Sequence, residues 1–131
     1  GYVAYDRIEA RIAAAPAVAF ADLPADTRAQ FTQLLQDGDK FTQYGDVAGA
    51  LDLFVRAYQL HPRNPEAVAR IEALFERVVT IGLRESDRQD LTTLKENLDG
   101  VLAIDDFLAH RAALVKADER LAARIASPAA N

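Results

Sequence analysis

The sequence predicts an all-α fold of about six helices, arranged as antiparallel hairpins. Half of the 131 residues are hydrophobic, which is enough apolar material for a helical core at this length. Alanine is abundant while glycine and proline number only six and five, a balance that favours helix. Apolar residues recur at helical spacing throughout, and no segment alternates with period two, so no sheet is expected.

The first expected elements are a helix and an apolar connector. A helix is predicted over Tyr2–Ala15, with one apolar face formed by Tyr5, Ile8 and Ile12. Pro16 ends it, because the residue before a proline avoids the helical region. The connector over 17–24 carries three apolar residues that we expect to pack against the helices: Val18, Phe20 and Leu23.

The second and third helices form the clearest predicted hairpin. The second begins near Asp26 or Thr27, with Thr27 and Gln30 as a capping box. Its expected buried side is formed by Phe31, Leu34, Leu35, Gly38 and Phe41. Gly38 lies mid-helix, where glycine costs about 1 kcal/mol relative to alanine, so a neighbouring helix should approach closely there. Gly45 ends this helix and Asp46 caps the third, over 47–60, whose apolar stripe contains Ala50, Leu51, Phe54, Ala57 and Tyr58.

Three further helices are predicted after Pro62. Asn64 and Pro65 start the fourth, which carries Val68, Ile71, Leu74, Phe75, Val78 and Val79 and frays near Gly82. Ser86 and Gln89 form a capping box for the fifth, which carries Leu91, Leu94, Leu98 and Val101. The next turn lies either at Asp99–Gly100 or at Ile104–Asp105. Asp105 or Asp106 then caps a last helix lined by Phe107, Leu108, Leu114, Val115, Leu121 and Ile125. We expect one domain over 1–126 and a disordered tail over 127–131.

Residues 31–64 combine large and small residues in an order that resembles the tetratricopeptide repeat (TPR), a helical hairpin of about 34 residues. The positions that carry the resemblance are Leu34, Gly38, Phe41, Gly45, Ala50, Phe54, Ala57 and Pro62. The resemblance implies a short right-handed superhelix in which Gly38 and Ala50 lie where the two helices cross. The following unit is degenerate, because Glu72, Arg84 and Arg88 replace the small and aromatic residues. An ordinary helical bundle with one hairpin of this spacing is the alternative.

The TPR resemblance also implies a function: a scaffold or adaptor module of a larger protein that binds a peptide or helix in a groove. By family position the groove residues are Leu35, Asp39, Gln43, Arg70, Ala73 and Arg77. Arg70 and Arg77 lie two turns apart and could pair with an acidic partner. The simpler alternative pairs Arg70 with Glu66, one turn back. Leu35 and Asp39 depart from the Lys and Asn of the family's carboxylate clamp, so that binding mode does not carry over.

Composition and motifs argue against several other classes of protein. The net charge of −5 disfavours nucleic-acid binding, and no apolar stretch reaches the roughly 18 residues of a membrane span. There is no cysteine, and His61 and His110 are far apart, so no metal site is expected. No nucleophile elbow or phosphate-binding glycine loop is present, and we expect neither an enzyme nor a cofactor.

A second functional hypothesis is a helical dimerisation or spacer domain without a ligand groove. Its self-association face would be formed by Leu108, Leu114, Val115 and Leu121. Because the chain begins at Gly1 and contains no methionine, we expect a mature fragment or an excised domain, from a bacterial protein. The sequence leaves open a cytoplasmic or periplasmic location and a membrane-anchored parent protein.

Overall fold

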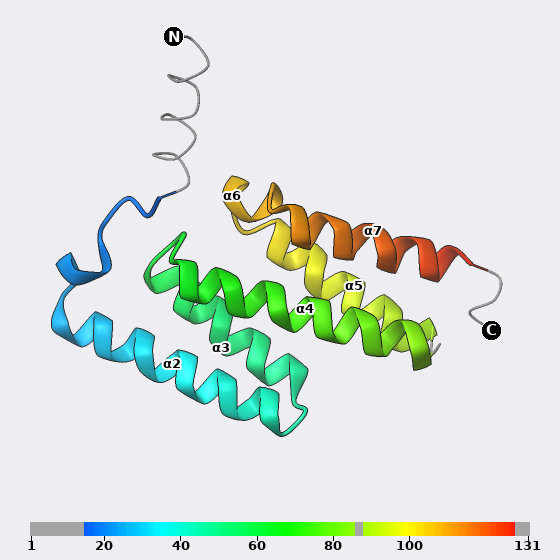
Figure 1. The fold of residues 1–131 in the computed structure, drawn as a ribbon, viewed down its shortest axis with the longest axis horizontal. Coiled ribbons are helices and arrows are strands. Elements are labelled where there is room, and N and C mark those ends of the chain that lie inside the picture. The colour runs from blue at the N-terminus through cyan, green and yellow to red at the C-terminus, as the bar shows by residue number, and fades with distance from the viewer. Residues whose placement is uncertain (1–14, 86–87, 128–131) are drawn as a thin grey trace, which may run out of the picture. The chain divides into compact units, whose positions relative to one another are not determined.

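The computed structural model describes residues 15–85 and 88–127. Over these ranges the chain forms one short 3-10 helix and six α-helices with no strand, which confirms the all-α class (Figure 1). The described residues fall into two compact units, one ending at Arg70 and the other beginning at Ile71. The helix expected over 2–15, except its last residue, lies outside the described ranges, as do Ser86 and the end of the predicted tail.

The first unit contains the predicted hairpin. It consists of the 3-10 helix η1 (Phe20–Asp22), α2 (Ala25–Gln43), α3 (Val47–Leu60) and the start of α4 (Pro65–Glu85). Helices α2 and α3 lie side by side and antiparallel (Figure 1). Gly45 makes the turn between them with a φ of 81°, in the region that favours glycine. Asp46 then caps α3 by accepting a hydrogen bond of 2.9 Å from Gly49 N, as predicted.

The start of α2 differs from the prediction. The helix begins at Ala25, after Pro24, and no side chain caps it. Thr27 is therefore already inside the first turn, where its backbone is helical and it cannot act as an N-cap. The predicted capping box of Thr27 and Gln30 is wrong because Pro24, in an extended conformation, starts the helix earlier.

The core of the hairpin forms where α2 and α3 press together. A Cβ atom added to Gly38 would lie 2.4 Å from Cε1 of Phe54, so the predicted close approach is confirmed. The buried apolar residues of the two helices are Phe31, Leu35, Ala50, Leu51, Phe54, Ala57 and Tyr58. Two residues expected on this face lie at its edge: Leu34 is half-buried and Phe41 is 39% exposed. At about 100° per residue both are turned away from the arc that Phe31, Leu35 and Gly38 share.

The turn from α3 into α4 follows the prediction closely. His61 and Pro62 end α3, and Arg63 adopts a φ of 67°, which costs a non-glycine residue free energy. Asn64 Oδ1 then accepts hydrogen bonds from Glu66 N at 2.8 Å and Ala67 N at 3.4 Å. Asn64 is thus the N-cap of α4. The helix continues to Glu85, beyond the fraying expected near Gly82.

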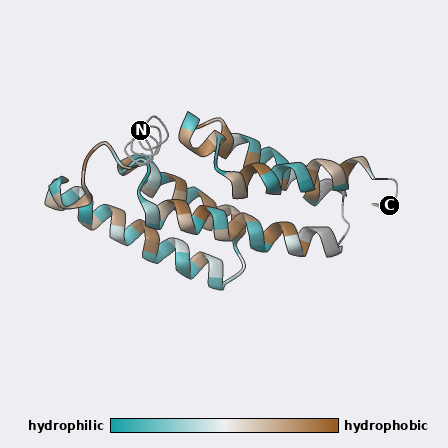
Figure 2. Ribbon diagram, turned by 45° about the horizontal axis from the view of Figure 1, so that its top comes forward, coloured by the Kyte–Doolittle hydropathy of each residue, from teal (hydrophilic) through white to brown (hydrophobic). Residues whose placement is uncertain are grey.

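The second unit contains the rest of α4, α5 (Arg88–Leu102), α6 (Asp106–Ala109) and α7 (Ala112–Ala126). Helices α5 and α7 pack together, and hydrophobic and hydrophilic residues alternate along them (Figure 2). The buried apolar residues of this unit are Ile71, Leu74, Phe75, Val78, Val79, Leu91, Leu98, Val101, Leu108, Leu114, Ala117 and Leu121.

The C-terminal turns resolve one open alternative and correct one prediction. Helix α5 runs through Gly100, so the turn lies at Ile104–Asp105, and Asp105 caps α6 with a hydrogen bond of 2.8 Å from Leu108 N. The single last helix expected from the sequence is broken at His110. The ring of His110 bonds through Nδ1 to the carbonyl of Asp106 at 2.7 Å, and the chain restarts as α7 at Ala112.

Candidate interaction surface

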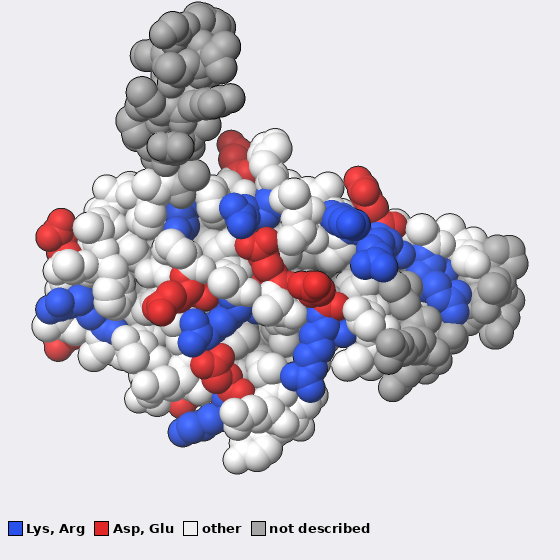
Figure 3. All heavy atoms as spheres, in the orientation of Figure 1, with Lys and Arg blue, Asp and Glu red and all other residues white. Residues whose placement is uncertain are grey.

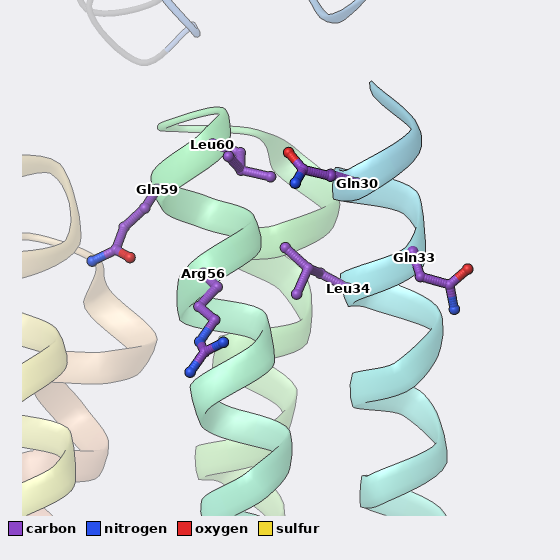
Figure 4. A pocket seen from close by; sticks show the side chains of 6 residues that line it. All are labelled: Gln30, Gln33, Leu34, Arg56, Gln59 and Leu60. Atoms are coloured by element: carbon purple, nitrogen blue, oxygen red, sulfur yellow. The ribbon is translucent and has the colours of Figure 1, made fainter. Parts of the chain in front are cut away.

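An open groove of about 470 Å³ lies between α2 and α3 in the first unit (Figure 4). It is lined by Gln30, Gln33, Leu34, Arg56, Gln59 and Leu60. Figure 4 shows Leu34 and Leu60 pointing from opposite helices into the gap, while Gln33 and Gln59 point away from it. The groove therefore has an aliphatic centre, with amide groups and one guanidinium around it.

Helical spacing builds the two walls of this groove. Gln30 and Leu34 are four residues apart on α2, and Arg56 and Leu60 are four residues apart on α3, so each pair shares one face of its helix. Around the rim, Arg56 is held by Asp52 at 3.0 Å. Both side chains of this pair are more than half exposed, so it holds the guanidinium only weakly.

Asp39 and Arg70, two of the predicted groove residues, are paired with each other. Arg70 Nε and Nη2 donate to the two carboxylate oxygens of Asp39 at 3.0 and 3.1 Å. This two-point contact raises the pKa of Arg70 above its ordinary value. Arg70 thus pairs with Asp39 and not with the carboxylate of Glu66, which was the alternative. Its only hydrogen bond to Glu66 runs from Nη1 to the backbone carbonyl, at 3.5 Å. The positive charge of Arg70, one of the two arginines expected to pair with an acidic partner, is thus compensated by Asp39 of the same chain.

The other predicted groove residues have varied surroundings. Leu35 is only 4% exposed and belongs to the core of the hairpin. Gln43, at the end of α2, is exposed, and so are Ala73 and Arg77 on the part of α4 that belongs to the second unit. Asp39 is five residues from Leu34, about 140° round α2, so the groove and the predicted face are on different sides of that helix.

A buried polar junction at the end of α3 was not anticipated from the sequence. His61 is 3% exposed, and its Nε2 bonds to the carbonyl oxygen of Val18 in the connector. Its Nδ1 is 2.8 Å from Asn64 Nδ2. The ring of Phe20 packs on Phe31 and on His61, with centroid distances of 5.2 and 5.8 Å.

This junction holds the connector against the end of α3, next to the groove. Of the connector residues expected to pack against the helices, Phe20 does so, whereas the side chain of Val18 is 47% exposed. The contact between His61 and Asn64 could have been predicted from the sequence, because the histidine at the end of α3 lies three residues before the asparagine that caps α4. The partner in the connector is 43 residues away, and no local pattern points to it.

The second unit carries a charged cluster between α5 and α7. Lys95 Nζ contacts Asp99 at 2.9 Å and Asp118 at 3.4 Å. Burial raises the pKa of Asp118, and the neighbouring Asp99 adds to this effect. The pKa of Asp99 is lowered, first by a hydrogen bond with Asp118 and then by one with Lys95. A smaller hollow of about 180 Å³ lies between α4 and α7 of the same unit.

Charges of both signs are interspersed on the face of the molecule drawn in Figure 3. Among the described residues, no three His, Asp or Glu side chains gather in a way that could hold a metal ion. No helix in the described ranges combines the length and apolarity that crossing a membrane requires. No protein-family model, curated protein or solved structure matches this chain.

Proposed function

We propose that this chain is a protein–protein interaction module of a larger protein, a scaffold or adaptor that receives an amphipathic helix or peptide in the α2–α3 groove. The observation that carries the proposal is the pair Leu34 and Leu60, half-buried apolar side chains that point into an open groove of about 470 Å³. A helix docks in such a groove through apolar residues at i, i+3, i+4 and i+7.

The chemistry of the lining favours binding over catalysis. Amides, leucines and one paired arginine supply no nucleophile and no general base. A TPR-like origin of the hairpin is supported by its packing: Ala50 and Ala57 are fully buried and Gly38 touches the ring of Phe54. In this proposal the buried repeat residues Gly38, Ala50, Phe54 and Ala57 hold α2 and α3 together. Leu34, a repeat position at the edge of the core, belongs to the binding surface with the other residues that line the groove.

The groove is a better candidate than the face carrying Asp39 and Arg70. The polar groups of that pair are already bonded to each other, so a partner would have to break a two-point contact to use them. The self-association alternative has a similar difficulty, because Leu108, Leu114 and Leu121 are each 0% exposed. That leaves the half-buried Val115 as the accessible member of the face expected to mediate dimerisation.

Site-specific photo-crosslinking tests the proposal. A photoreactive amino acid is placed in the groove at Gln30, and in a matched variant at Thr32, which is exposed about 160° round the same helix. In the native host, we expect adducts with one or a few defined proteins from position 30 and none of the same mass from position 32. Equal adduct patterns at both positions, or adducts at position 32 alone, would exclude the groove as the binding surface.

A further inference from the structure

His61 is a buried titratable residue that the proposed function does not use. It is 3% exposed, and its ring packs on the rings of Phe20 and Phe31, with centroid distances of 5.8 and 6.3 Å. Within the described ranges, its side chain forms hydrogen bonds only with the carbonyl of Val18 and the amide of Asn64. These contacts hold the connector, through Val18 and Phe20, at the end of α3.

No charged group compensates the ring within the described part of the chain. The charged residues on the elements packed around His61 are Asp22 on η1, Arg28 on α2, Arg63 in the turn and Glu66 on α4. None of them is a hydrogen-bond or ion-pair partner of the imidazole. A proton added to the buried ring would therefore be an unpaired charge, which costs free energy.

The amide of Asn64 determines which form of the ring fits. Its Oδ1 accepts from the backbone of Glu66 and Ala67 at 2.8 and 3.4 Å, so its Nδ2 is the atom that faces the imidazole. Nδ2 can only donate, so Nδ1 of His61 accepts and carries no proton. Nε2 then carries the single proton of the ring and donates to the carbonyl of Val18. The junction thus fits the neutral imidazole.

We propose that this junction is an acid-sensitive switch, in which protonation of His61 at Nδ1 releases the connector from the end of α3. A proton on Nδ1 would place two donors 2.8 Å apart. The amide of Asn64 cannot turn its oxygen to the ring without removing the cap of α4. The ring therefore leaves its place, and Val18 and Phe20 lose their anchor. The switch does not depend on what the α2–α3 groove binds.

Falling pH should favour release of the connector. The docked form holds a neutral ring, whereas an imidazole that is open to water binds a proton below about pH 6.5. The released form therefore binds more protons than the docked form. Acid should shift the equilibrium toward release by up to about tenfold for each pH unit below about 6.5.

NMR spectroscopy of the full chain tests the switch. In the docked form the rings of Phe20 and Phe31 have a centroid distance of 5.2 Å, close enough for a nuclear Overhauser effect between their protons. We expect this signal to be present at about pH 7.5 and lost by about pH 5, while circular dichroism shows that the helices remain. The chain has one other histidine, the exposed His110, and the control variant His110→Gln should keep the transition.

The variant Asn64→Asp should remove the sensitivity to acid. Aspartate caps a helix about as well as asparagine, and its second oxygen can accept from a protonated Nδ1. The signal between Phe20 and Phe31 should then persist at about pH 5. The proposal is overturned if the natural chain keeps the signal at that pH, or if His110→Gln abolishes the transition. It is also overturned if Asn64→Asp, still helical, loses the signal at the same pH as the natural chain.

Discussion

The side-chain amide of Asn64 donates a hydrogen bond of 2.8 Å to Nδ1 of His61. The orientation of the amide is fixed, because Oδ1 accepts from the backbone of Glu66 at the start of α4. Nδ1 of the histidine must then accept, which leaves Nε2 to carry the proton and donate to Val18. One asparagine thereby links the start of α4 to the connector that precedes α2.

Replacing Asn64 with alanine should cost more than the loss of a helix cap. The cap itself contributes about 1 kcal/mol, and a buried imidazole nitrogen left without its partner costs about 1–3 kcal/mol more. We therefore expect Asn64→Ala to lower the free energy of unfolding by about 2–4 kcal/mol, measured by urea denaturation. Asp46→Ala, which removes the exposed cap of α3 alone, is the control and should cost about 1 kcal/mol. Equal losses in the two variants would contradict the role given to His61.

Two glycine substitutions should change stability in opposite directions. Gly38→Ala places a methyl group against the buried ring of Phe54, and the overpacking should outweigh the gain in helix propensity by about 1–2 kcal/mol. Gly100→Ala adds a methyl group on α5 with no atom within 4 Å, so it should stabilise by about 0.5–1 kcal/mol. Thermal unfolding of both variants measures the difference, and a stabilising Gly38→Ala would show that α2 and α3 are not in close contact.

The contact between Asp39 and Arg70 should appear as a coupling energy. Both side chains are partly exposed, at 46% and 32%, so we expect a coupling of about 0.5–1 kcal/mol in a double-mutant cycle of Asp39→Asn and Arg70→Gln. The coupling should fall when salt is raised to about 1 M, since exposed charges are screened. Additive effects of the two substitutions at low salt would mean that the pair does not form in solution.

The pH dependence of stability should show that the ionised carboxylate of Asp118 is disfavoured in the folded chain. Its pKa is raised above its ordinary value in the folded chain, so the group stabilises the fold only while it is protonated, and this contribution is lost as pH rises through the folded pKa. Asp118→Asn should therefore gain stability relative to the natural chain as pH increases from about 4 to 7. Asp99→Asn should do the reverse, because the pKa of Asp99 is lowered and its stabilising effect is lost as pH falls. Parallel pH profiles for the three proteins, from urea denaturation, would contradict this assignment.

Local signals in the sequence predicted much of the first unit. Gly45, Asp46 and the Asn64–Pro65 pair specify helix ends by their own backbone and capping chemistry, and α3 has the expected bounds. Gly38 predicted a close approach because only a neighbouring helix explains a glycine at that place. These features depend on residues within a few positions of one another.

The candidate site could not be predicted in the same way. The partner of Arg70 is 31 residues away, so a pattern based on one helix pointed to Glu66 instead of Asp39. The groove depends on which edge of α2 meets which edge of α3, and the spacing of apolar residues along one helix does not give this. Leu34 was therefore expected in the core, whereas it lines the groove. The break after His110 lies at Arg111, whose backbone is extended, and the regular hydrophobic spacing of Phe107, Leu108 and Leu114 gave no sign of it.

The central claim is that the α2–α3 groove, and not the face of Asp39 and Arg70, binds a partner. The most direct test is the yield of the adduct formed from Gln30 in two backgrounds. Leu34→Gln removes an apolar contact from the groove and should lower the yield at least about fivefold, whereas Arg70→Gln should leave it unchanged. A yield that falls with Arg70→Gln and is unaffected by Leu34→Gln would contradict the account and return the interaction to the opposite side of α2.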